Sequence, residues 1–245
     1  MSEGNGLRLA VMSDTHYGRH ATGSLREVFA KASDEADVLL LCGDLTDYGL
    51  VEEAEMLAED LRTSVKIPVL AVLGNHDFES ATPKLVREVV EKAGVIVLDG
   101  ECHEIDGIGF AGVSGFGGGF GATMLNAWGE PLIKQFVQEA VNESLKLEQA
   151  LAKLRTERTV VLLHYSPIRQ TIEGEPLEIY PFMGSSRLEV PLNQYKVQVA
   201  FHGHAHRGVL EGRTSEGIPV FNASIPVLKR LRPDKPPFLI YDVTR

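Results

Sequence analysis

Polar side chains that could bind a metal ion or carry a proton lie at the ends of short apolar runs in this sequence. They are Asp14 and His16 in MSDTH, Asp44 in LCGDLTD, Asn75, His76 and Asp77 in LGNHD, His164 in LLHYSP, and His204 and His206 in GHAH. Imidazole, carboxylate and amide groups without a thiolate suit borderline divalent ions such as Mn, Fe, Zn, Co or Ni. The sequence therefore predicts a metal centre.

This set offers more ligands than one tetrahedral ion can accept. It suits two divalent ions that share a bridging carboxylate at a separation of ~3.5–4 Å. We therefore expect one centre with two divalent metal ions. The ligand types leave the identity of the metals open.

The elements that must position these residues follow from the apolar pattern of the first half. LRLAVMSD, ADVLLLCGD and IPVLAVLGNHD are strand-like runs, and a helical pattern follows each of them. Ser24 is the expected N-cap of the first helix, and Thr82 before Pro83 is the expected start of the third. Three such repeats predict a parallel sheet that is buried on both faces. The carboxyl ends of its strands converge on one crevice, where distant residues can meet.

The sequence pattern of the second half predicts a mixed sheet. CHEIDGIGFAGVSG resembles a hairpin that turns at Asp106 and Gly107, and residues 130–158 form a helical pattern. We then expect a strand in TVVLLHYSP, a loop-rich stretch over 168–194, a strand in VQVAFHGHAH and hairpin-like segments up to FLIYDVTR. The length of 245 residues fits one domain, residues 1–245.

Composition narrows the classes of function. The formal net charge of −10 disfavours a broad surface for nucleic acid or an anionic membrane. Two cysteines are too few for a disulfide framework. The sequence shows neither a signal-peptide pattern nor an apolar run of the ~18 residues that span a bilayer. We therefore expect a cytoplasmic protein that binds neither nucleic acid nor a membrane.

Five sequence blocks, in this order, resemble the calcineurin-like metallophosphoesterases. They are Asp14-Thr15-His16, Gly43-Asp44-Leu45-Thr46-Asp47, Gly74 to Asp77, the isolated His164, and Gly203 to His206. The resemblance implies an α/β fold, a four-layer αββα sandwich with two central mixed sheets between helices. It also implies that Asp14, His16, Asp44 and His206 hold one metal and that Asp44, Asn75, His164 and His204 hold the other.

The implied activity is hydrolysis of a small-molecule phosphomonoester or phosphodiester. The two ions would carry more positive charge than Asp14 and Asp44 neutralise, so the metal-loaded site would attract a phosphoryl anion. A hydroxide bridging the metals would attack phosphorus in line. His76 is implied as a catalytic group, and Asp77, also placed in the catalytic set, could hold it or could simply cap the turn.

Several residues and loops near the predicted site have two possible interpretations. Asp47 could cap the next helix or orient a ligand. The glycine-rich residues 115–122 predict a mobile loop, and 168–194 could form a cap over the site or an ordinary surface loop. Arg207 could contact a substrate phosphate or face solvent. His202 precedes Gly203, where the strand is expected to end, so we expect it to pack without binding metal.

Two other functions remain possible. One is a non-catalytic scaffold of the same fold that binds protein partners, although such a protein would be expected to lose ligands. The other is a nuclease-type phosphodiesterase, which the net charge and the absence of a basic stripe with aromatic residues disfavour.

Overall fold

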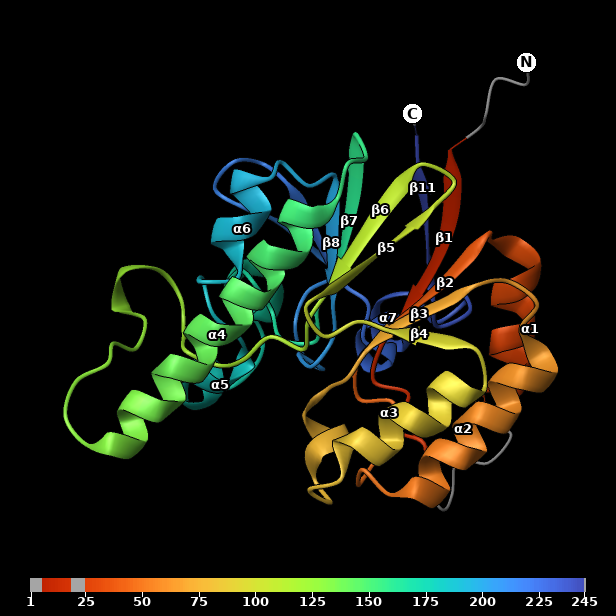
Figure 1. Cartoon of the computed structure of the whole chain (residues 1–245), viewed down its shortest axis with the longest axis horizontal. Helices are drawn as coiled ribbons and strands as arrows, with labels where there is room; N and C mark the ends of the chain where they lie inside the picture. The colour runs from red at the N-terminus through yellow and green to blue at the C-terminus, as the bar shows by residue number, and fades with distance from the viewer. Residues whose placement is uncertain (1–5, 19–24, 245) are drawn as a thin grey trace.

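The computed structural model describes residues 6–18 and 25–244, and in this part of the chain two mixed β-sheets lie between helices (Figure 1). One sheet has the order β11-β1-β2-β3-β4 and the other β5-β6-β7-β8-β10-β9. The strands are β1 (Leu7–Met12), β2 (Val38–Cys42), β3 (Val69–Val72), β4 (Val95–Val97), β5 (Glu101–Ile105), β6 (Ile108–Gly112), β7 (Arg158–Leu162), β8 (Val199–His202), β9 (Glu211–Arg213), β10 (Pro219–Asn222) and β11 (Leu239–Val243).

Helices complete the fold of the described residues. They are α1 (Arg26–Glu35), α2 (Val51–Ser64), α3 (Pro83–Lys92), α4 (Pro131–Lys153), α5 (Tyr180–Met183), α6 (Glu189–Gln194) and α7 (Ile225–Leu231). Figure 1 shows α1, α2 and α3 beside the sheet of β1 to β4, and α4 and α6 beyond the sheet of β5 to β8.

Alternation along the strands explains the layers. In β1, Leu9 and Val11 pack between the two sheets, while Ala10 and Met12 pack under the helices of the first sheet. Successive side chains of a strand point to opposite faces, so an entirely apolar strand can serve two cores at once. The outer face of the second sheet packs against α4, for example through Leu147. The predicted four-layer sandwich is confirmed.

Local patterns predicted much of the first half and the central hairpin. The parallel pairs β1–β2 and β2–β3 confirm the βα repeats. β5 and β6 pair antiparallel, and both Asp106 and Gly107 have positive φ, as a two-residue hairpin turn requires.

Other expectations need correction. The helix over 130–158 ends at Lys153, and Arg158 already begins β7. Pro83 begins α3 as predicted, but the Thr82 side chain makes no capping hydrogen bond. The predicted N-cap Ser24 lies outside the described residues.

The C-terminal region differs most from the sequence-based prediction. It contains α7, whose N-cap Ser224 accepts a hydrogen bond from the Val227 amide. After α7 the chain leaves the second sheet, and β11 pairs antiparallel with β1 of the first sheet. The loop-rich stretch over 168–194 also contains α5 and α6. Among the described residues, no helix combines the length and the apolar character needed to cross a membrane.

Candidate metal centre

The two sheets meet at the carboxyl ends of their central strands, and the predicted site residues follow these ends. β1 leads into Asp14, β2 into Asp44 and β3 into Asn75. In the second sheet, β7 leads into His164 and β8 into His204. Hydrogen bonds join the two edges: the His204 amide donates to Asp14 Oδ1 at 3.1 Å, and His164 Nδ1 donates to the Cys42 carbonyl at 3.0 Å.

One group of possible ligands contains Asp14, His16 and His206. His206 Nε2 lies 2.9 Å from Asp14 Oδ1. His16 Nε2 lies 4.0 Å from Asp14 Oδ1 and 3.9 Å from Asp44 Oδ2, so His16 faces both carboxylates.

A second group contains Asp44, His164 and His204, and a further one, of His16, Asp47 and His76, shares His16 with the first. His164 Nε2 lies 3.3 Å from Asp44 Oδ1 and 2.9 Å from Asn75 Oδ1, which brings the predicted amide ligand to the same place. Asp44 therefore contacts both groups and is placed where a bridging carboxylate is needed.

The ring nitrogens fit a cation between these side chains. Neither nitrogen of His16 makes a hydrogen bond, although both are buried. His164 Nδ1 donates to the Cys42 carbonyl at 3.0 Å, so its Nε2 faces Asn75 and Asp44 oxygens and needs either a proton or a metal ion there. His204 Nε2 donates to the Phe182 carbonyl at 3.1 Å, and this leaves the Nδ1 lone pair free.

The electrostatics of the protein without metal follow from burial and close charges. Burial opposes ionisation of Asp14 and Asp44, but the hydrogen bond from His206 to Asp14 and the charge of His164 beside Asp44 outweigh it, so the pKa of both carboxyls is lowered. Burial also opposes protonation of His164, yet Asp44 raises its pKa to about 9. Burial lowers the pKa of His204 to about 4. Both carboxylates are thus ionised at neutral pH, as metal ligands must be.

Backbone strain is concentrated at these residues. Asp14, His16, Asp44 and His204 all have positive φ, which is uncommon for residues with a Cβ atom. Backbone hydrogen bonds hold this conformation, for example from the Asp14 amide to the Gly43 carbonyl and from the His16 amide to the Asp44 carbonyl, each at 3.0 Å. Strained positions of this kind persist where the surroundings over-determine them and are common at functional sites.

Glycine is required where the segments approach most closely. A Cβ atom on Gly74 would collide with the backbone and carboxylate of Asp44, and one on Gly203 would collide with Ser13 and Asp14. The glycines of the sequence blocks therefore allow the carboxylates and imidazoles to converge.

The backbone of Asp47 orients His76. Its Nδ1 donates to the Asp47 carbonyl at 2.6 Å, while the Asp47 carboxylate lies 3.4 Å from His16 Nδ1. The helix cap, the other interpretation of Asp47, comes from Glu53, which accepts from the Leu50 amide. Asp47 is the second aspartate of the sequence block Gly43 to Asp47, and this position in the block is the sequence signal for its place in the site.

Asp77 supports the turns that carry the site. Its buried carboxylate accepts hydrogen bonds from the amides of Leu45, Thr46 and Gly74 and from the Thr46 hydroxyl, at 2.6–3.1 Å. Burial and the charge of Asp44 raise its pKa to about 6. This geometry matches the turn-capping interpretation of Asp77, and the orientation of His76 comes from Asp47 instead.

The remaining candidates lie at the margin of the site. His202 ends β8 and is buried, and its Nε2 contacts the Thr171 hydroxyl at 2.7 Å. His202 belongs to none of the possible ligand groups found among the described residues. Arg207 is exposed.

The glycine-rich residues 115–122 are joined to the stretch over 168–194. The Gly118 amide donates to the Pro181 carbonyl, and the Gly119 amide donates to the Gly184 carbonyl. The same stretch supplies the Phe182 carbonyl that contacts His204. Both segments therefore border the site, and each is fixed to the other by backbone hydrogen bonds.

Comparison with known proteins identifies the family. A model described as calcineurin-like phosphoesterase matches residues 7–208, which include every site residue described above. The chain belongs to the calcineurin-like phosphoesterase family. A relative described as the uncharacterized protein MJ1162 of Methanocaldococcus jannaschii is 29% identical over 205 residues, which cover 82% of this chain and 80% of the relative.

Solved structures of low sequence identity share the fold. The phosphopantetheinyl hydrolase PptH of Mycobacterium tuberculosis superposes with a TM-score of 0.70 at 16% identity, over 97% of this chain and 96% of that one. The protein TT1561 of Thermus thermophilus gives a TM-score of 0.58 at 16% identity, over 97% and 99% of the two chains. These matches support the calcineurin-like architecture.

Proposed function

We propose that this protein hydrolyses a phosphomonoester or phosphodiester at a centre that holds two divalent metal ions. The observation that carries the proposal is the pair of ligand groups that meet at Asp44, with the buried nitrogens of His16 left without hydrogen bonds beside it. Family membership supports the same class of chemistry. The PptH structure, which has the same fold, is described as a phosphopantetheinyl hydrolase.

The residues divide between the two ions as the ligand groups do. Asp14, His16 and His206 would hold one ion, Asn75, His164 and His204 the other, and Asp44 would contact both. Mn, Fe, Zn, Co and Ni all suit this donor set. Ions bound there would supply an activated water and Lewis-acid stabilisation of the phosphoryl oxygens.

His76 would act on the departing oxygen. Because its Nδ1 hydrogen is donated to Asp47, its Nε2 is the atom free to carry and donate a proton. Its side chain is 37% exposed, so a substrate can reach it. A step of this kind is typically worth ~10²–10⁴ in rate.

Asp47 and Asp77 would serve as positioning residues. Asp47 fixes the ring of His76, and Asp77 ties the turn of Gly74 to the segment of Leu45 and Thr46. Both act through their neighbours and need no contact with the substrate.

A substrate panel with metal analysis tests this function. The metal-loaded protein should release phosphate from aryl phosphates or cleave aryl phosphodiesters, and Asp44→Asn should abolish this activity. The panel includes cyclic nucleotides, nucleotides and single-stranded DNA, so that nuclease-type activity is measured too. A folded, metal-free protein inactive on the whole panel would instead support the non-catalytic scaffold.

A further inference from the structure

A cavity of about 310 Å³ adjoins the second ligand group, and we call it the side cavity. Asn75 and Tyr165 line it, and both also contact the site. Asn75 Oδ1 lies 2.9 Å from His164 Nε2, and the Tyr165 ring centroid lies 4.6 Å from that of His204. A molecule whose phosphoryl group lies at the metal centre can therefore extend into this cavity.

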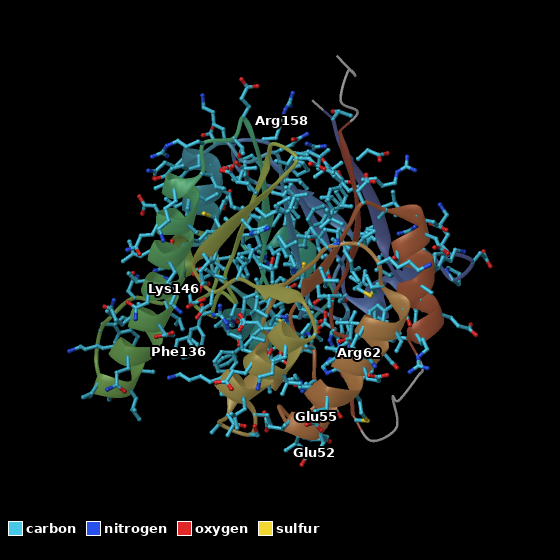
Figure 2. All side chains as sticks on the ribbon, turned by 45° about the vertical axis from the view of Figure 1, so that its right-hand side comes forward. Glu52, Glu55, Arg62, Phe136, Lys146 and Arg158 are labelled. Carbon is cyan, nitrogen blue, oxygen red and sulfur yellow. The ribbon has the colours of Figure 1, made fainter. Side chains whose placement is uncertain are left out.

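The apolar part of the lining is aromatic. Phe78, Phe116 and Tyr165 face the side cavity. Phe116 is held from both sides, since its ring centroid lies 4.8 Å from that of Phe136 and 5.9 Å from that of Tyr165. Figure 2 labels Phe136 on α4, the helix that forms the outer wall. Fixed aromatic faces bind flat organic groups well and attract positive charge at their faces.

The charged part of the lining is predominantly acidic. It contains the carboxylates of Asp99, Glu139 and Glu143 against the single ammonium of Lys146. That ammonium is already paired, because Lys146 Nζ lies 2.7 Å from Glu143 Oε1 and 3.0 Å from Asp99 Oδ1. Glu143 also accepts from the Gly115 amide at 2.8 Å and so fixes the loop that carries Phe116.

The metal centre and the side cavity differ in charge, so each would bind a different part of the substrate. The metal centre would attract the phosphoryl anion, while the side cavity offers aromatic faces and an excess of negative charge. Resting on the function proposed above, we infer that the side cavity binds the organic group of the substrate and selects a planar group without negative charge. Charge repulsion disfavours a second phosphate or a carboxylate on that group.

Two aryl phosphates test this selection. They are the phosphate esters of 4-methylphenol and of 4-(carboxymethyl)phenol, in which a methylene group separates the carboxylate from the ring, so that the leaving groups have similar basicity. The metal-loaded protein should hydrolyse the phosphate ester of 4-methylphenol with a kcat/KM about tenfold higher than that of the 4-(carboxymethyl)phenol ester. Equal values for the two esters would overturn the inference.

Variants assign the discrimination to the side cavity. Glu139→Gln removes one exposed carboxylate from the lining and should reduce the ratio of the two kcat/KM values by about two- to threefold. Glu55→Gln is the matched control, because Glu55 is exposed on α2 and does not line the cavity. Figure 2 shows it apart from Lys146 of the lining, and the ratio of the two kcat/KM values in this variant should equal that of the parent protein. The same ratio in both variants would contradict the proposed binding mode.

The aromatic wall has its own test. Phe78 is 48% exposed, so Phe78→Ala should fold, and it should lower kcat/KM for both esters by about three- to tenfold. An unchanged kcat/KM in this variant would remove Phe78 from the binding surface.

Direct binding separates failure of the side cavity from failure of the proposed hydrolysis. If the protein hydrolyses neither these esters nor any member of the substrate panel above, the proposed function falls, and calorimetry with 4-methylbenzylphosphonate and 4-(carboxymethyl)benzylphosphonate then decides about the cavity. Tighter binding of the methyl compound, weakened by Phe78→Ala, supports the cavity. Equal binding of the two compounds, or none, overturns it.

Discussion

At the scale of single residues, the site separates groups that would hold metal from groups that would move a proton. His76 donates its Nδ1 hydrogen to the Asp47 carbonyl, whereas Asp44 lies between the two ligand groups. His76→Ala should therefore retain both metals and lower kcat by ~10²–10⁴, while Asp44→Ala should lose metal and activity together. Metal analysis beside steady-state kinetics checks this, and normal turnover in His76→Ala would remove that residue from the mechanism.

The histidines of FHGHAH give a second prediction at this scale. His202 is buried against the Thr171 hydroxyl, and its replacement by alanine should cost ~0.5–1.5 kcal/mol of unfolding free energy, because this hydrogen bond is lost. His202→Ala should nevertheless retain two metal ions, whereas His206→Ala should lose one. The comparison requires elemental analysis of both variants after dialysis. Loss of metal from a folded His202→Ala variant would contradict the assignment of His202 as a residue that packs without binding metal.

At the scale of elements, a buried tyrosine connects the site segment to two helices. The Tyr17 hydroxyl donates to Asp60 of α2 at 2.8 Å, and Arg26 of α1 lies 2.7 Å from the same carboxylate. Burial, followed by the hydrogen bond to Asp60, raises the pKa of Tyr17 above its ordinary value of ~10. The folded protein therefore keeps this tyrosine neutral at a pH where the unfolded chain ionises it.

This linkage predicts the alkaline stability. The contribution of Tyr17 is fully present below pH ~10 and is lost as the pH rises above that value, because the proton is released more readily from the unfolded chain. Tyr17→Phe should lower the unfolding free energy at pH 8 by ~0.5–1.5 kcal/mol and should flatten its decline between about pH 9 and 11. Urea unfolding across this range measures both effects. Parallel curves for the parent and the variant would refute the assignment.

The elements also show what the sequence could and could not predict. β1 to β3, the hairpin at Asp106 and the placement of ligands after strand ends follow from apolar runs and turn residues, which are local signals. The pairing of β11 with β1 and the contact of Asp47 with His76 join residues brought together only by the fold. α7 is short, and its single capping residue, Ser224, gave too weak a pattern to predict it.

At the scale of the whole molecule, the sheets share one core. Val11 and Leu40 of the first sheet pack in the same cluster as Phe110 and Val160 of the second. We propose that residues 1–245 form one domain, and we expect one cooperative unfolding transition for the metal-free protein. Calorimetry should give equal calorimetric and van't Hoff enthalpies, and two separate transitions would contradict the single domain.

The proposed function depends on two metal ions around Asp44. Anomalous diffraction from crystals of the Mn²⁺-loaded protein tests it most directly. We expect two anomalous peaks separated by ~3.5–4 Å, one beside Asp14, His16 and His206 and the other beside Asn75, His164 and His204, with Asp44 in contact with both. A single peak, or peaks that Asp44 does not contact, would contradict it.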